Sequence, residues 1–114
     1  MRVLFYPEAE AELKALPPRE RGAMLTAIGK LEVLGDRLPA PHSSAVKGVS
    51  STLRELRPRA GRSAWCAFYR RIGSSNVIGA IAPEATVDPA GFRRAVERAV
   101  NRLGAVERTE QTNE

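Results

Sequence analysis

Arginine side chains, which can bind phosphate or carboxylate groups, are concentrated in one short stretch of the chain. Residues 54–71 carry six arginines against a single acidic residue, so this stretch alone has a net charge of +5. Residues 1–53 sum to +1 and residues 72–114 to −1. A guanidinium group binds a phosphate or carboxylate through two parallel hydrogen bonds, so the stretch indicates a surface for a polyanion or an acidic partner. The six arginines are Arg54, Arg57, Arg59, Arg62, Arg70 and Arg71.

A solvated hairpin is the competing interpretation of this stretch, because arginine supplies 15 of the 18 basic residues. Other reactive side chains are few. Cys66, between two apolar neighbours, is more typical of a small buried side chain than of a nucleophile. His42, the only histidine, lies in a serine-containing stretch; we expect it to be solvated, with a general acid or base role left open. Trp65 and Tyr69 fall on one strand face, where they could pack the sheet or stack on bases.

The size and composition of the chain are those of a small globular domain. Its 114 residues suffice for one buried core, and 43% hydrophobic with 27% charged residues excludes a disordered chain. No apolar stretch approaches the roughly 20 residues that span a bilayer. A single cysteine cannot form an internal disulfide and excludes a multi-cysteine metal site. We therefore expect a cytoplasmic protein with one domain over 1–104 and a disordered polar tail over 105–114.

The elements that must position the arginines begin with a strand and two helices. Residues 2–6 are mainly β-branched and aromatic and end at Pro7, which predicts a first strand. Apolar residues at three- and four-residue spacing predict helices over about 7–16 and 18–35, joined by a proline turn into a helical hairpin. Residues 36–50, which contain prolines and serines, are expected to form a loop.

Three strands and a helix are predicted in the second half of the chain. Residues 51–57, 62–71 and 76–82 favour strands, and the glycine-containing turns between them indicate hairpins. An apolar stripe over 89–104 predicts a final helix. The order β-α-α-β-β-β-α belongs to the α+β class, with a small, mainly antiparallel sheet whose helices pack on one face. The other face would be partly open, and an open face lined with arginine could cradle a nucleic acid backbone.

The arginine-rich segment also carries a family signature. Residues 53–70 read LRELRPRAGRSAWCAFYR. Together with the element order, this segment resembles the RelE/HigB superfamily of toxins from type II toxin–antitoxin systems, and within it the phage-derived Gp49-like branch that contains HigB. In that branch a Leu-Glu-Leu-Arg strand, a short glycine-containing turn and a strand ending in aromatic-Tyr-Arg lie between a helical hairpin and a C-terminal helix. The resemblance spans about residues 1–104.

The resemblance implies a metal-independent endoribonuclease, or mRNA interferase, that needs no cofactor. Such a toxin cuts mRNA on the ribosome, inhibits translation and arrests growth. It is neutralised by a cognate antitoxin, here expected to be of the helix-turn-helix type. It contacts operator DNA only through the complex with this antitoxin, and it does not bind a membrane. In this chemistry a ribose 2′-OH attacks the adjacent phosphate while a cation stabilises the phosphorane. The matching catalytic positions are Arg57, Tyr69 and Arg70, and the RNA-binding positions are Arg54, Arg59 and Arg71.

Three features depart from the family pattern, and one of them is that the only histidine, His42, lies in the loop before the strands, whereas in the family the loop after the last strand often contains a histidine. Cys66 stands where family members commonly carry an arginine three residues before the tyrosine, and Arg62 is the candidate that replaces this charge as a catalytic residue. Residues 83–88 form an acidic loop where the family loop is basic. These departures leave two other functions open: a ParE-like toxin that binds gyrase, or a catalytically degenerate protein whose arginines bind only RNA or an antitoxin.

The predicted final helix carries a second group of arginines. They are spaced four residues apart and therefore share one helix face: Arg94, Arg98 and Arg102. One interpretation is a solvated face. The other is a docking surface for an acidic segment of the antitoxin or for phosphates of ribosomal RNA.

Overall fold

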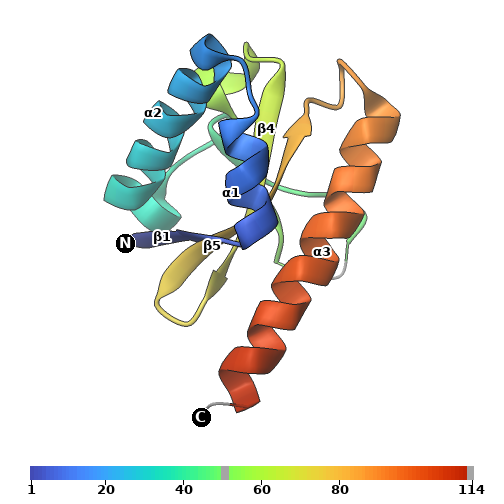
Figure 1. Cartoon of the computed structure of the whole chain (residues 1–114). Coiled ribbons are helices and arrows are strands. Elements are labelled where there is room, and N and C mark those ends of the chain that lie inside the picture. Colours follow the sequence, from blue (N-terminus) through green and yellow to red (C-terminus); the bar gives the residue numbers. More distant parts are fainter. Residues whose placement is uncertain (50–51, 113–114) are drawn as a thin grey trace.

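Five strands form one sheet in a computed structural model of the chain, which describes residues 1–49 and 52–112 (Figure 1). The strand order is β1-β5-β4-β3-β2. β1 pairs with β5 in parallel, and the other three pairings are antiparallel. The strands are β1 (Arg2–Phe5), β2 (Ser43–Ala45), β3 (Arg54–Leu56), β4 (Trp65–Ile72) and β5 (Ser75–Pro83).

The long β4–β5 hairpin is the centre of the sheet. Its register pairs Ile72 with Ser75, so the chain reverses through two residues. Gly73 adopts a φ of 62°, a left-handed conformation that glycine reaches without the strain of a side chain. β5 is buried along almost its whole length, including side chains on both faces, so the sheet requires cover on both sides.

Helices supply this cover on both faces of the sheet. α1 (Pro7–Lys14) and α2 (Pro18–Leu34) pack on one face, which we call the hairpin face; α3 (Pro89–Thr112) packs on the opposite face, which we call the α3 face (Figure 1). Alternation along β4 separates the two cores, because Ala67 contributes to the hairpin face and Phe68 to the α3 face. The α+β class is confirmed. The expectation that all helices share one face, with an open arginine-lined face, is wrong.

The packing of α3 on β5 is close. A Cβ at Gly79 of β5 would lie 2.8 Å from Cγ of Leu103, so only glycine fits there without displacing the helix. α3 begins after Asp88, whose Oδ1 accepts a 3.0 Å hydrogen bond from the Gly91 backbone N–H, as an N-cap residue does. None of the helices in the described part of the chain is long and apolar enough to cross a membrane.

Two element boundaries differ from the sequence predictions. The predicted loop 36–50 contains β2, a three-residue edge strand that pairs with β3 and has no apolar alternation to reveal it. α3 continues eight residues past its predicted end, because Val106 packs in the α3-face core and Glu107 pairs with Arg70. Residues 105–112 are therefore helical, while 113–114 of the expected tail, and Ser51 of the strand predicted over 51–57, lie outside the described residues.

Candidate functional site

The turn between β3 and β4 brings three of the arginines to one corner of the molecule. We call Arg57, Arg59 and Arg62 the arginine corner; they flank or belong to a 3₁₀ turn, η2 (Pro58–Gly61). Arg59 has a φ of 51° and is the one non-glycine residue with a positive φ among the described residues. Such a conformation costs about 1 kcal/mol or more and is held by surrounding contacts. One of these is the 3.5 Å ion pair of Arg59 with Glu20 on α2.

Arg57 is held by two carboxylates rather than left free for a ligand. Its Nε donates a 3.0 Å hydrogen bond to Oε1 of Glu55 and lies 3.7 Å from Oε2 of Glu84. The hydrogen bond to Glu55 is the main cause that raises the pKa of Arg57; partial burial opposes it, and the negative charges of Glu55 and Glu84 add smaller increases. Its side chain is 35% exposed, so Arg57 forms the solvent side of this group. Glu55 of β3 thus pairs with Arg57, the residue that directly follows this strand.

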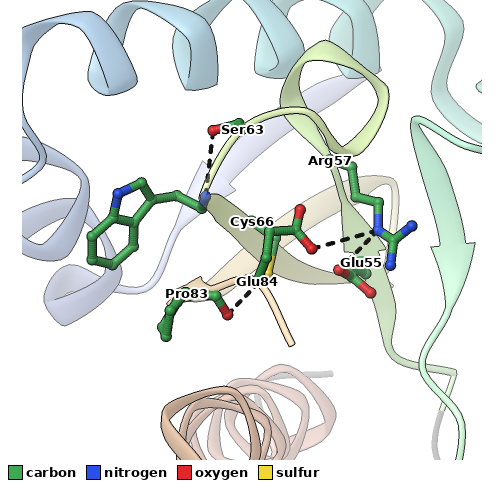
Figure 2. A network of polar contacts seen from close by, with 7 residues as sticks. Glu55, Arg57, Ser63, Cys66, Pro83 and Glu84 are labelled. Atoms are coloured by element: carbon green, nitrogen blue, oxygen red, sulfur yellow. Dashed lines mark hydrogen bonds and ion pairs between the residues drawn. The ribbon is translucent and has the colours of Figure 1, made fainter. Parts of the chain in front are cut away.

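Beneath Arg57, three acidic groups from separate segments of the chain meet in the protein interior (Figure 2). Glu55 of β3, Cys66 of β4 and Glu84, the residue after β5, each place one oxygen or sulfur atom within 4.8 Å of the other two. We call these residues the acid–thiol cluster. Burial, and then the negative charge of Glu55, raise the pKa of Glu84 to about 7. Burial is also the main cause that raises the pKa of the Cys66 thiol, so this thiol is protonated at neutral pH.

Tyr69 and Arg70 are neighbours on β4 and point to opposite faces. The Tyr69 hydroxyl shares a 2.5 Å hydrogen bond with Oγ of Ser43, and its ring packs in the hairpin-face core. Arg70 is buried on the α3 face and pairs with Glu107 of α3. No hydrogen bond or ion pair recorded within residues 1–49 and 52–112 joins either side chain to Arg57. These contacts hold Tyr69 and Arg70 as parts of two separate core layers.

The predicted RNA-binding residue Arg54 lies close to Tyr69. Its Nε donates a 2.9 Å hydrogen bond to Oγ of Ser43, and Arg54 and Tyr69 line one cavity of about 280 Å³. Arg71 lies at the far end of β4, where its guanidinium donates to Asp36 at 2.9 Å and to the Gly73 carbonyl at 3.3 Å. The structure therefore places Arg54 beside Tyr69, because the two residues are register partners in β3 and β4. The arginine corner lies further along, at the turn that joins these two strands.

Of the three arginines that share one face of α3, one is held by contacts within the fold and two are exposed on the surface. Arg102 forms a 3.0 Å ion pair with Glu12 of α1, donates to the Gly79 carbonyl at 3.0 Å and lies 5.5 Å from the ring centre of Tyr6. It therefore ties α3 to α1 and β5. Arg94 and Arg98 are exposed on the same helix, and neither has an ion-pair partner in the described part of the chain.

A basic cavity beside the arginine corner includes two residues that sequence reasoning did not place there. Lys30 of α2, His42 before β2 and Arg59 line a cavity of about 300 Å³. They lie 12 and 17 residues apart, on three different elements, and no local spacing connects them. Only the packing of η2 against α2 brings them together, so long-range contacts are the one signal that finds this site.

The order of the elements and the helices on both faces of the sheet are those of the fold of the RelE toxins. The free form of a mutant toxin RelE from E. coli is 16% identical and superimposes with a TM-score of 0.60 over 85% of this chain and 95% of that one. The RelB-RelE antitoxin-toxin complex from Methanococcus jannaschii matches at 13% identity and a TM-score of 0.58, over 76% and 96% of the two chains. The toxin-antitoxin complex RelBE2 from Mycobacterium tuberculosis matches at 25% identity and 0.53, over 74% and 91%.

Within this fold, the sequence itself shows the family. The model of the phage derived protein Gp49-like family (DUF891) matches residues 11–78, which is more than half of the chain. The chain belongs to this family, and its resemblance to the RelE/HigB superfamily is confirmed. No curated protein is similar enough in sequence to count as a match.

Proposed function

We propose that this chain is the toxin of a type II toxin–antitoxin pair, and that it acts in the cytoplasm as a ribosome-dependent mRNA endoribonuclease. Membership of the Gp49-like family and the fold shared with RelE support the toxin class. The observation that carries the choice of RNA as target is the basic cavity beside the arginine corner, where two cations and the only histidine of the chain meet.

The basic cavity offers the groups that cleavage of RNA by its own 2′-hydroxyl requires. Lys30 and Arg59 supply positive charge for the phosphate, whose charge increases as the 2′-oxygen attacks. His42 carries the only imidazole of the chain, and imidazole is the side chain that most often serves as a general acid or base, so it is assigned the proton transfer from the 2′-hydroxyl. Arg62 is exposed, and its Nε donates only a weak 3.4 Å hydrogen bond to the Arg59 carbonyl, so it is placed to bind the flanking phosphate.

Other predicted catalytic positions are assigned to the scaffold under this proposal. Arg57 is engaged by Glu55 and Glu84, and Tyr69 and Arg70 are buried with partners in opposite core layers. This arrangement also favours a second candidate function, a toxin or a degenerate relative that binds its target without cutting it. The two candidates agree on the antitoxin and differ in whether RNA is cleaved.

The experiment that separates these functions is induction of the chain alone, followed by primer extension on a reporter mRNA. The proposal expects growth arrest with cuts inside the translated region, and far fewer cuts for His42→Ala and Lys30→Ala. Arg19→Ala, which removes an exposed charge from the same helix as Lys30, is the matched control and keeps the cuts. Arrest with intact message selects the binding toxin, and growth without arrest contradicts both toxin assignments.

The antitoxin is the expected partner of this protein, and the toxins RelE in two of the similar structures are in complex with one. We expect a helix-turn-helix antitoxin encoded beside this chain, which carries the operator-binding function of the complex. Binding to the folded toxin also stabilises it by mass action. Co-expression should restore growth and raise the melting temperature of the toxin; a neighbour that does neither is not the antitoxin.

A further inference from the structure

Three groups that are common metal ligands converge in the acid–thiol cluster. The cluster lies on three adjacent segments of the sheet, so the pairing of β3 with β4 and of β4 with β5 fixes the positions of Glu55, Cys66 and Glu84 (Figure 2). All three residues are buried, and their ligand atoms lie within 4.8 Å of one another. Surface carboxylates gather without consequence, but carboxylates withdrawn from water need compensating partners.

The partners of the cluster are too few for its charge. Arg57 is the one cation paired with it among the described residues, and it serves both carboxylates. Glu84 is only 4% exposed, and its Oε1 atom is buried without a hydrogen-bond partner in the described structure. The Cys66 thiol donates a weak 3.9 Å hydrogen bond to the Pro83 carbonyl, and it also interacts with the Glu55 carboxylate. A buried carboxylate oxygen without a donor destabilises the fold, and a bound cation would remove this cost.

We propose that Glu55, Cys66 and Glu84 bind one Zn²⁺ ion. A thiolate with two carboxylates suits Zn²⁺, whereas Mg²⁺ and Ca²⁺ prefer oxygen ligands alone. Zn–S and Zn–O distances of about 2.3 and 2.0–2.2 Å place tetrahedral ligand atoms roughly 3.3–3.7 Å apart, so the cluster needs to contract by about 1 Å. The single cysteine excludes a multi-cysteine site but not this mixed one.

The sum of the charges in the acid–thiol cluster favours a bound Zn²⁺ ion. With both carboxylates and the thiolate ionised, the three ligands carry three negative charges, which Zn²⁺ and the Arg57 guanidinium together neutralise. On binding, the S–H bond of Cys66 breaks, its proton passes to solvent, and the sulfur electron pair forms the bond to zinc. Three protein ligands leave a fourth position for water.

The test is metal binding by the full chain after removal of metal with EDTA and dialysis. Titration with Zn²⁺ in a calorimeter should show one ion per chain and release of at least one proton, measured from the dependence of the heat on the buffer. Titration with Co²⁺ should produce the intense near-ultraviolet absorption of a cobalt–thiolate bond. Cys66→Ser should abolish this band, and Glu84→Gln should weaken binding at least tenfold.

A matched control removes a carboxylate outside the cluster. Glu20→Gln changes a partly buried residue that pairs with Arg59, and it should bind both metals as the wild type does. A folded wild-type protein that shows no cobalt–thiolate band overturns the proposal without any variant. Equal zinc affinity in the wild type, Cys66→Ser and Glu84→Gln also overturns it, because the ion is then bound elsewhere. The proposed nuclease site does not enter this test, so either proposal can fail alone.

Discussion

Replacement of Glu84 by glutamine should stabilise the metal-free protein at alkaline pH and leave it almost unchanged at acid pH. In the folded chain, burial and the negative charge of Glu55 raise the pKa of Glu84 to about 7, against an ordinary value of 4.5. A carboxyl group whose folded-state pKa is raised stabilises the fold fully below pH 4.5. That contribution is lost as pH rises through 7, because ionisation is easier in the unfolded chain.

The size of the effect follows from the pKa difference. One pKa unit corresponds to 1.36 kcal/mol, so a carboxylate shifted from 4.5 to about 7 loses up to about 3 kcal/mol by pH 8. Glutamine has the same shape and no charge, so Glu84→Gln avoids this loss. It also removes the 3.7 Å ion pair with Arg57, which offsets part of the gain. We expect a net stabilisation of about 1–2 kcal/mol at pH 8.

The assay is urea unfolding at pH 5, 6, 7 and 8 with EDTA present. Wild-type stability should fall across this range relative to Glu84→Gln, and the two curves should cross or meet near pH 5. Glu20→Gln, which lies outside the cluster, should follow the wild-type pH profile. Parallel pH profiles of stability for the wild type and Glu84→Gln would refute the claim that the pKa of Glu84 is raised in the folded protein.

Four further substitutions test the packing around the sheet by urea unfolding. Arg70→Met should be neutral or stabilising, whereas Glu107→Gln should cost about 1–2 kcal/mol because it removes the partner of the buried Arg70 charge; equal effects would contradict the pairing of Arg70 with Glu107. Gly79→Ala should cost about 1–3 kcal/mol, since its Cβ would meet the Leu103 side chain at 2.8 Å, and an unchanged midpoint would show that α3 moves freely. Tyr69→Phe should cost about 1 kcal/mol and leave mRNA cleavage intact; loss of cleavage with unchanged stability would return Tyr69 to the active site.

The predictable part of the fold is the part with strong local patterns. The first strand, the helical hairpin and the start of the last helix follow from apolar periodicity and proline positions, and the structure places them at Arg2–Phe5, Pro7–Lys14, Pro18–Leu34 and Pro89 onwards. β2 was missed because an edge strand of three small residues gains its order from pairing with β3 rather than from its own sequence. The end of α3 was missed because its last turns are polar and are held by contacts with distant residues, such as that of Glu107 with Arg70.

The candidate site could be located only in part from the sequence. The charge count identifies the arginine corner, because the charged residues are adjacent in the chain. The basic cavity and the acid–thiol cluster are formed by residues from different elements, so their grouping depends on sheet register and on the packing of α2. The sequence shows that Cys66 is the only cysteine and that Glu84 lies in an acidic stretch, but not that both side chains meet Glu55 in the interior.

The central claim, that this Gp49-like protein cleaves mRNA on the ribosome, is tested most directly with purified components. Protein that has been treated with EDTA is added to a defined mRNA, with and without translating ribosomes, in a buffer that holds enough Mg²⁺ for the ribosomes. The RNA ends are then mapped. The account predicts cuts in the wild-type reaction only when ribosomes are present, and their loss with His42→Ala but not with Arg19→Ala. Intact mRNA in the presence of translating ribosomes and a folded wild-type protein would contradict it.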